Sequence, residues 1–203
     1  MSHCKASARR VSAGNLIACL AVAISVLLCG GNAVRATSYL SVTFDELIAG
    51  ADVIFVGEVT DVRPFPLNTR DGTIIKTRVV FRVSDPLWGT TSALEVFDFL
   101  GGEWGDVGMV VAEMPQFTVG DRRVVFARRE QSINPIVGFT QGLLRVSRDS
   151  GGVERVFTLD GAPLGQPDQI GLRSNIDTAT PIAPISLSAF RARVSRAVAE
   201  ERR

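Results

Sequence analysis

Hydrophobic and polar residues alternate with a period of two in several parts of the chain, and this pattern predicts a set of short β-strands. In the clearest segment, residues 76–83, the apolar Val79 and Phe81 alternate with the basic Arg78 and Arg82. One apolar face and one charged face are typical of a half-buried strand. Further strands are predicted at residues 53–59, 94–99, 107–114, 122–127, 142–147 and 153–158.

Two helices are predicted, one before the first strand and one at the C-terminal end. Thr43 followed by Glu46 three residues later is a capping box, and Gly50 ends this short helix. From Ser186 onward, apolar residues recur at the helical period on one stripe, as expected for a helix that packs on a core. The stripe consists of Leu187, Phe190, Val194 and Val198.

Glycine and proline mark the segments between these elements. Pro64, Pro66 and Asp71 with Gly72 predict a loop after the first strand, and four glycines predict another at residues 101–108. No helices alternate with the strands, which argues against a parallel α/β fold. Short strands with a helix at each end favour a compact barrel or sandwich.

The first 36 residues have the order of a secretory signal peptide. Basic residues from Lys5 to Arg10 precede the uncharged apolar run 16–29, and small residues at Ala33 and Ala36 offer two cleavage positions. The run is shorter than the roughly 20 residues that span a bilayer, which disfavours an uncleaved anchor. We predict cleavage after Ala36 and export to the periplasm or the medium.

Cleavage removes all three cysteines and the single histidine of the chain. Cys19 resembles a lipoprotein processing site, but too little apolar sequence precedes it. The mature residues 37–203 contain no disulfide, so their core has to supply the stability. Removal of the signal leaves 18 basic and 21 acidic residues, a net charge near −3. This charge argues against nucleic acid or an anionic membrane as the partner.

The missing histidine and cysteine also exclude the common nucleophile–base pairs and zinc sites from the mature domain. We therefore predict no catalytic site, no cofactor and no metal. Lys76, the only lysine after cleavage, is interpreted as solvated, because it lies on the polar face of a predicted strand. Asp98, Glu103 and Asp106 are the best candidates for calcium ligands, but their spacing differs from an EF-hand and favours solvation.

Five side chains are candidate contacts for a partner. Arg122, Arg123 and Arg128 lie at the two ends of one predicted strand, where they could bind an anionic group. Trp88 and Trp104 lie in loops flanked by glycine and could serve as binding anchors. The alternatives are arginines that protect a strand edge and tryptophans that cover the end of a barrel.

Three stretches share a pattern with a known group of modules: residues 51–59 (ADVIFVGEV), 117–126 (FTVGDRRVVF) and 137–146 (VGFTQGLLRV). Together they resemble the netrin-like modules, which include the tissue inhibitors of metalloproteinases, and most of all the exported bacterial members of that type. The resemblance covers about residues 42–158. It implies a small antiparallel OB-type barrel with flanking helices.

The chain departs from those inhibitors at one important point. In the inhibitors, the mature N-terminus is a cysteine of a Cys-x-Cys pair whose amine and carbonyl bind the zinc of the protease, whereas the expected start here is Thr37-Ser38-Tyr39. We therefore carry over the fold type and leave out the inhibitory residues. The predicted organisation is a signal peptide (1–36), a β-barrel domain (37–159), an irregular Pro/Gly-containing segment (160–185) and an amphipathic C-terminal helix (186–203).

The predicted function is non-catalytic binding of another secreted or envelope protein, with a metalloprotease as the first partner to test. The alternatives are a structural component of the cell envelope and a hydrolase with a carboxylate site.

Overall fold

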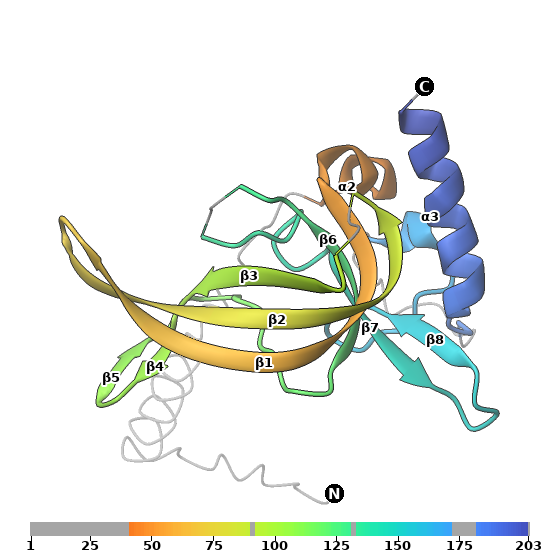
Figure 1. The fold of residues 1–203 in the computed structure, drawn as a ribbon. Coiled ribbons are helices and arrows are strands. Elements are labelled where there is room, and N and C mark those ends of the chain that lie inside the picture. The colour runs from red at the N-terminus through yellow and green to blue at the C-terminus, as the bar shows by residue number, and fades with distance from the viewer. Residues whose placement is uncertain (1–40, 90–91, 131–132, 172–181, 203) are drawn as a thin grey trace, which may run out of the picture. The chain divides into compact units, whose positions relative to one another are not determined.

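The computed structural model describes residues 41–89, 92–130, 133–171 and 182–202, all within one compact unit, Leu40–Arg203. The predicted signal peptide and both of its cleavage positions lie outside the described residues. Figure 1 shows a mostly β fold with a large antiparallel sheet and two α-helices in the described part. This confirms the mostly β character of the prediction, while the strands at the two ends of the sheet do not pair into a closed barrel in these residues. No helix in these residues is long and apolar enough to cross a membrane.

Six strands form the large sheet in the order β3-β2-β1-β6-β7-β8, and every neighbouring pair is antiparallel. The strands are β1 (Val53–Thr69), β2 (Gly72–Trp88), β3 (Leu94–Leu100), β6 (Arg122–Ala127), β7 (Leu143–Arg148) and β8 (Glu154–Phe157). A separate hairpin consists of β4 (Gly102–Trp104) and β5 (Val107–Met109). A 3-10 helix lies at Pro167–Gln169.

Two predictions about loops were wrong. The segment with Pro64 and Pro66 is not a loop, because β1 continues through it to Thr69 and pairs with β2 along its whole length. The glycine-rich segment 101–108 is not an open loop either, since it forms most of the β4–β5 hairpin. The strand predicted at residues 107–114 ends at Met109.

The hydrogen-bond pattern explains why β1 tolerates its two prolines. The Gly101 N–H donates to the Ile75 carbonyl across the β2–β3 pair at 2.8 Å. Since backbone groups alternate in direction, Ile75 points toward β3, and its β1 partner Pro66 therefore has its nitrogen on the side away from β2. Pro64 follows the same alternation. At both positions β6 is absent, because it pairs only with Val53 to Glu58, and proline is compatible with such an unpaired strand edge.

The sheet is apolar on both faces. On one face, Phe44, Phe126 and Phe190 make edge-to-face contacts with ring centroids 6.2–6.5 Å apart. Phe55, Phe81 and Phe97 form a similar cluster on the other face. This arrangement accounts for the unbroken apolar run at the start of β1, which alternation alone would not produce.

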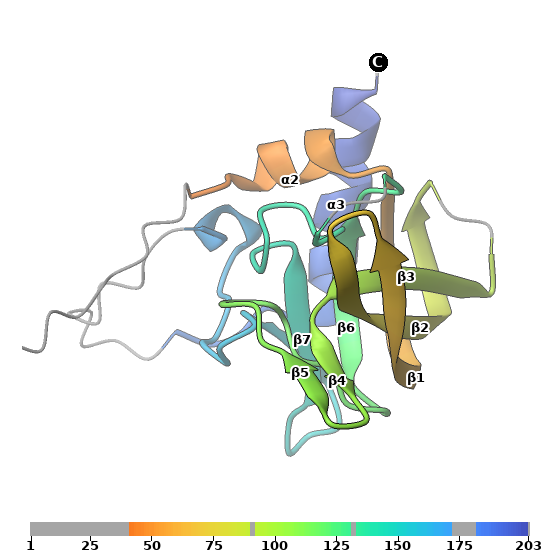
Figure 2. The same ribbon diagram turned by 90° about the vertical axis from the view of Figure 1, so that its left-hand side faces the viewer.

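Two helices cover the first of these faces. Helix α2 (Phe44–Gly50) and helix α3 (Leu187–Glu201) lie beside each other in both Figure 1 and Figure 2. Ser186 is the N-cap of α3 and accepts a hydrogen bond from the Ala189 N–H at 3.2 Å. The whole predicted stripe of α3 is buried, which confirms the amphipathic C-terminal helix.

The capping box of α2 is also present as predicted, and it makes the first helix sensitive to pH. The Thr43 N–H and the Thr43 hydroxyl donate to the Glu46 carboxylate at 2.7 and 3.0 Å. These two hydrogen bonds hold the pKa of Glu46 below its ordinary value.

Protonation of Glu46 is therefore expected to weaken α2. Because the folded-state pKa is lowered, the charged carboxylate stabilises the fold above the ordinary carboxyl pKa, and this stability is lost as the pH falls through the lowered value. Thr43→Ala removes the hydroxyl donor and keeps the N–H donor. It should therefore move the pKa of Glu46 part of the way back toward its ordinary value in an NMR titration. An unchanged titration in Thr43→Ala would contradict this explanation, and Glu46→Gln serves as the assignment control.

Candidate functional site

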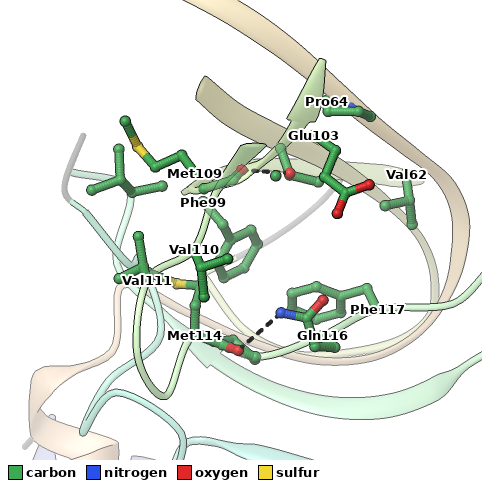
Figure 3. Close-up of a pocket in the computed structure, with 15 residues that line it drawn as sticks. Val62, Pro64, Phe99, Glu103, Met109, Val110, Val111, Met114, Gln116 and Phe117 are labelled. Carbon is green, nitrogen blue, oxygen red and sulfur yellow. Dashed lines mark hydrogen bonds between the residues drawn. The ribbon is translucent and has the colours of Figure 1, made fainter. Parts of the chain in front are cut away.

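A pocket of about 430 Å³ opens beside the outer half of the β1–β2 hairpin. Its other walls are the end of β3, the β4–β5 hairpin and the following segment 110–117. The lining is mainly apolar and includes Val62, Phe99, Met109, Val110, Met114 and Phe117 (Figure 3). The volume is in the range of pockets that hold small ligands or a partner's side chain.

Two glycines bring the β4–β5 hairpin close to the hairpin β1–β2. Gly101 links β3 to β4, and its carbonyl accepts a hydrogen bond from the Thr77 hydroxyl at 2.7 Å. Gly102 has a φ of 130°, and a side chain here would collide with Thr77. Glycine therefore allows the close approach that forms one wall of the pocket.

Aromatic rings form the floor of the pocket. The rings of Phe99 and Phe117 lie 4.7 Å apart between centroids, and Phe117 also meets Phe81 of the core edge-on at 5.7 Å. The floor is thus continuous with the buried cluster on this face of the sheet. Met109 and Met114 stand around it, and their flexible thioethers can adapt to apolar groups of different shape.

Apolar side chains are exposed to solvent at Val110, which lines the pocket, and at Val107 and Trp104 in the β4–β5 hairpin that forms one of its walls. Val110 is 96% exposed, Val107 60% and Trp104 48%. Glu103 is the one ionisable side chain among the described residues that line the pocket (Figure 3). Exposed apolar residues around an apolar cavity are typical of an interaction site. The arrangement can bind an apolar group, and it places one carboxylate beside it.

The structure places the two candidate tryptophans at different locations. Trp104 lies in β4 directly after Glu103, in the hairpin that forms one wall of the pocket, but it is not one of the lining residues. Trp88 ends β2 and pairs with Ile54, and the Arg202 guanidinium lies 5.3 Å from the centre of its ring. Of the two tryptophans, only Trp104 belongs to an element that lines the pocket.

The three candidate arginines each have partners within the chain. Arg122 forms an ion pair with Glu154 and donates to the Ser84 hydroxyl at 3.1 Å. Arg123 is buried and donates to the Asp121 carboxylate at 2.6 Å. Arg128 is exposed and donates to the Gly50 carbonyl at 3.2 Å. The structure does not bring these arginines together with Trp104.

Asp98, the first of the three candidate calcium ligands, is engaged in an ion pair with Arg78. Arg78 donates to both carboxylate oxygens of Asp98, at 2.8 and 2.9 Å, and this interaction raises the pKa of Arg78. No group of three or more histidine, cysteine, aspartate or glutamate side chains could hold a metal ion in the part of the chain that the structure describes.

The residues of the pocket were missed by sequence reasoning. Phe99 was placed only in a strand, and Met114 and Phe117 were assigned to no site. The signal was the set of apolar residues Val107, Val110 and Val111 within a segment rich in glycine, where a solvated loop would carry polar residues. No protein-family model matches the chain, and no curated protein matches it.

Proposed function

We propose that the protein is an exported, non-catalytic binding module that holds another exported or envelope protein. The apolar pocket would receive an apolar side chain of the partner, while Trp104, Val107 and Val110 contact the surface around it. The observation that carries the proposal is the aromatic floor of Phe99 and Phe117 in a pocket that is also lined by the fully exposed Val110. Such pockets concentrate binding energy in a few residues.

The proposed fold is a variant of the netrin-like, OB-type barrel. Support comes from the meander of β1, β2 and β3 and from β6, which returns to the other side of β1. A secreted metalloprotease is the first partner that we propose to test. Binding would have to use the pocket, because the zinc-binding cysteine of the inhibitors is missing from the expected N-terminus.

A capture experiment with variants of Val110 and Trp104 tests the proposed function. The full chain is expressed with a tag, and the exported protein is used to capture partners from the native exported fraction. Val110→Glu and Trp104→Ala should each lower recovery of a partner about tenfold, because an exposed apolar side chain that is buried on binding contributes about 1–2 kcal/mol when it acts as an anchor of the interface.

Val153→Glu is the matched control, because Val153 is also exposed but lies near the β7–β8 turn. Its recovery should equal that of the unchanged protein. Equal recovery by all variants would contradict the pocket as the binding site. Turnover of a small substrate by the purified protein, with no partner captured, would contradict the proposed function as a whole.

A further inference from the structure

The longest strand edges of the sheet lie on β8, on the outer half of β1 and on β3, and the first two are protected. The edge of β8 is covered, because the Val156 N–H donates to the Ile185 carbonyl at 3.0 Å and the Val156 carbonyl accepts from the Leu164 N–H at 3.3 Å. The outer half of β1 carries Pro64 and Pro66, which present no N–H to an incoming strand. The third stretch is the outer edge of β3.

The hydrogen bonds of β3 show which of its residues face outward. Val83 donates to the Ala93 carbonyl at 2.9 Å, so the odd-numbered residues of β3 direct their backbone groups toward β2. The even-numbered residues face the outer edge, and accordingly the Leu100 N–H donates to the Ile133 carbonyl at 2.9 Å. For Val96 and Asp98, the outward backbone groups have no hydrogen-bond partner among the described residues.

A second pocket of about 430 Å³ reaches from this edge across the face of the sheet, where Phe65, Leu67, Lys76 and Arg78 also line it. Val96, Phe97 and Asp98 line it in succession along the strand, and residues 128–130 with Pro135 stand on the opposite side. The bond between Leu100 and Ile133 closes one end. The pocket therefore adjoins Val96 and Asp98, whose outward backbone groups have no hydrogen-bond partner among the described residues.

The charges around this pocket are mostly positive. Its ionisable lining residues are Lys76, Arg78, Arg128 and Arg129 against Asp98 and Glu130. Asp98 is already neutralised by Arg78, and Arg129 is paired with Glu95. Lys76 has no ion pair in the described residues. The excess of positive charge favours an acidic ligand.

We propose that the outer edge of β3 binds an extended, acidic segment of a partner protein as an added β-strand. The segment would exchange backbone hydrogen bonds with Val96 and Asp98, while its acidic side chains lie near Lys76 and Arg128. Main-chain pairing of this kind gives affinity, and the flanking side chains give specificity. This site lies apart from the apolar pocket, because Val96 and Asp98 point to the opposite face of β3 from Phe99.

Peptide binding to the protein from full-chain expression tests this inference. The probe is a fluorescently labelled seven-residue peptide of alternating threonine and glutamate, and the comparison is the same peptide with lysine in place of glutamate. The acidic peptide should bind about tenfold more tightly, since two like-charged contacts are replaced by attractive ones. Lys76→Glu should remove most of this preference. Equal binding of both peptides would overturn the proposed charge of the ligand.

The backbone pairing is tested by Val96→Pro, with Val96→Ala as the matched control. Proline removes the outward N–H without removing a bond to β2, whereas alanine keeps the N–H and removes only the side chain. Val96→Pro should weaken binding of the acidic peptide about tenfold relative to Val96→Ala, as expected for one lost hydrogen bond and a steric block. Equal affinity of the two variants would overturn the proposal.

Two further measurements keep the test decisive. If Val96→Pro lowers the melting temperature strongly, an acidic peptide N-methylated at alternate residues on its pairing edge replaces the variant, and it should bind about tenfold more weakly than the unmethylated peptide. Analytical ultracentrifugation asks whether a second copy occupies the edge instead. A dimer that Val96→Pro dissociates, with no peptide binding, would overturn the proposal in favour of self-association.

Discussion

Phe190→Asp is expected to unfold the domain or to lower its melting temperature by about 15 °C or more. Phe190 is fully buried on α3, and its ring meets those of Phe44 and Phe126 edge-on. Loss of a buried phenylalanine side chain alone costs about 3–5 kcal/mol, and an unpaired carboxylate in the same place adds a desolvation penalty. For a domain of this size, each kcal/mol corresponds to roughly 2–4 °C.

Ser195→Asp is the matched control for this substitution. Ser195 lies on the same helix and is exposed, so the new carboxylate remains in water. Its melting temperature, measured by circular dichroism, should stay within about 2 °C of the unchanged protein, as is usual for surface substitutions. A Phe190→Asp protein that melts like the Ser195→Asp protein would mean that α3 is not packed on the sheet in solution.

Arg129→Ala is expected to cost about 2 kcal/mol in the free energy of unfolding. Glu95 is only 4% exposed, and Arg129 donates to both of its carboxylate oxygens at 3.1 and 3.2 Å. Removal of the guanidinium takes two charge-assisted hydrogen bonds from a buried carboxylate, which is more costly than the loss of an exposed ion pair. Arg129 itself is half-exposed, so water offsets part of the loss.

A second substitution separates this explanation from a simple loss of packing. Adding Glu95→Leu to Arg129→Ala removes the buried carboxylate that has lost these two hydrogen bonds and should recover part of the lost stability in urea unfolding. Arg63→Ala is the control, because the Arg63–Asp61 pair is largely exposed and should contribute less than about 0.5 kcal/mol. No recovery in the double variant would show that the Arg129 side chain stabilises the fold by its contacts rather than by its charge.

The parts of the fold that sequence predicted well are those decided by short-range chemistry. Thr43 and Glu46 form their capping box through residues three positions apart, and the stripe on α3 needs only the helical period. The prolines of β1 show the limit of this reasoning. Whether Pro64 breaks the strand depends on whether another strand lies on the side of its nitrogen. The strand on that side of β1 is β6, which is more than fifty residues away in the sequence and pairs only as far as Glu58.

The candidate site was predicted less well for a related reason. Arg122 and Arg123 are adjacent in the sequence, but a strand directs them to opposite faces, and only the fold shows which face is buried. Arg123 turned out to be inside, beside Asp121, two residues earlier on the same side. The pocket joins Val62 and Phe117, which no local pattern connects. Trp104 was identified as a candidate contact because its glycine-flanked position was visible in the sequence.

Contacts between residues far apart in the sequence also affect how fast this protein folds. Arg202 donates to the Ala51 carbonyl at 3.4 Å across 151 residues of sequence, and the Val42 N–H donates to the Gln141 side chain across 99. Contacts between residues so distant in sequence require long loops to close before they add stability, and they make folding slow. One layer of the core cannot be completed until the last helix is available. A newly made chain therefore remains without its full core until synthesis reaches α3.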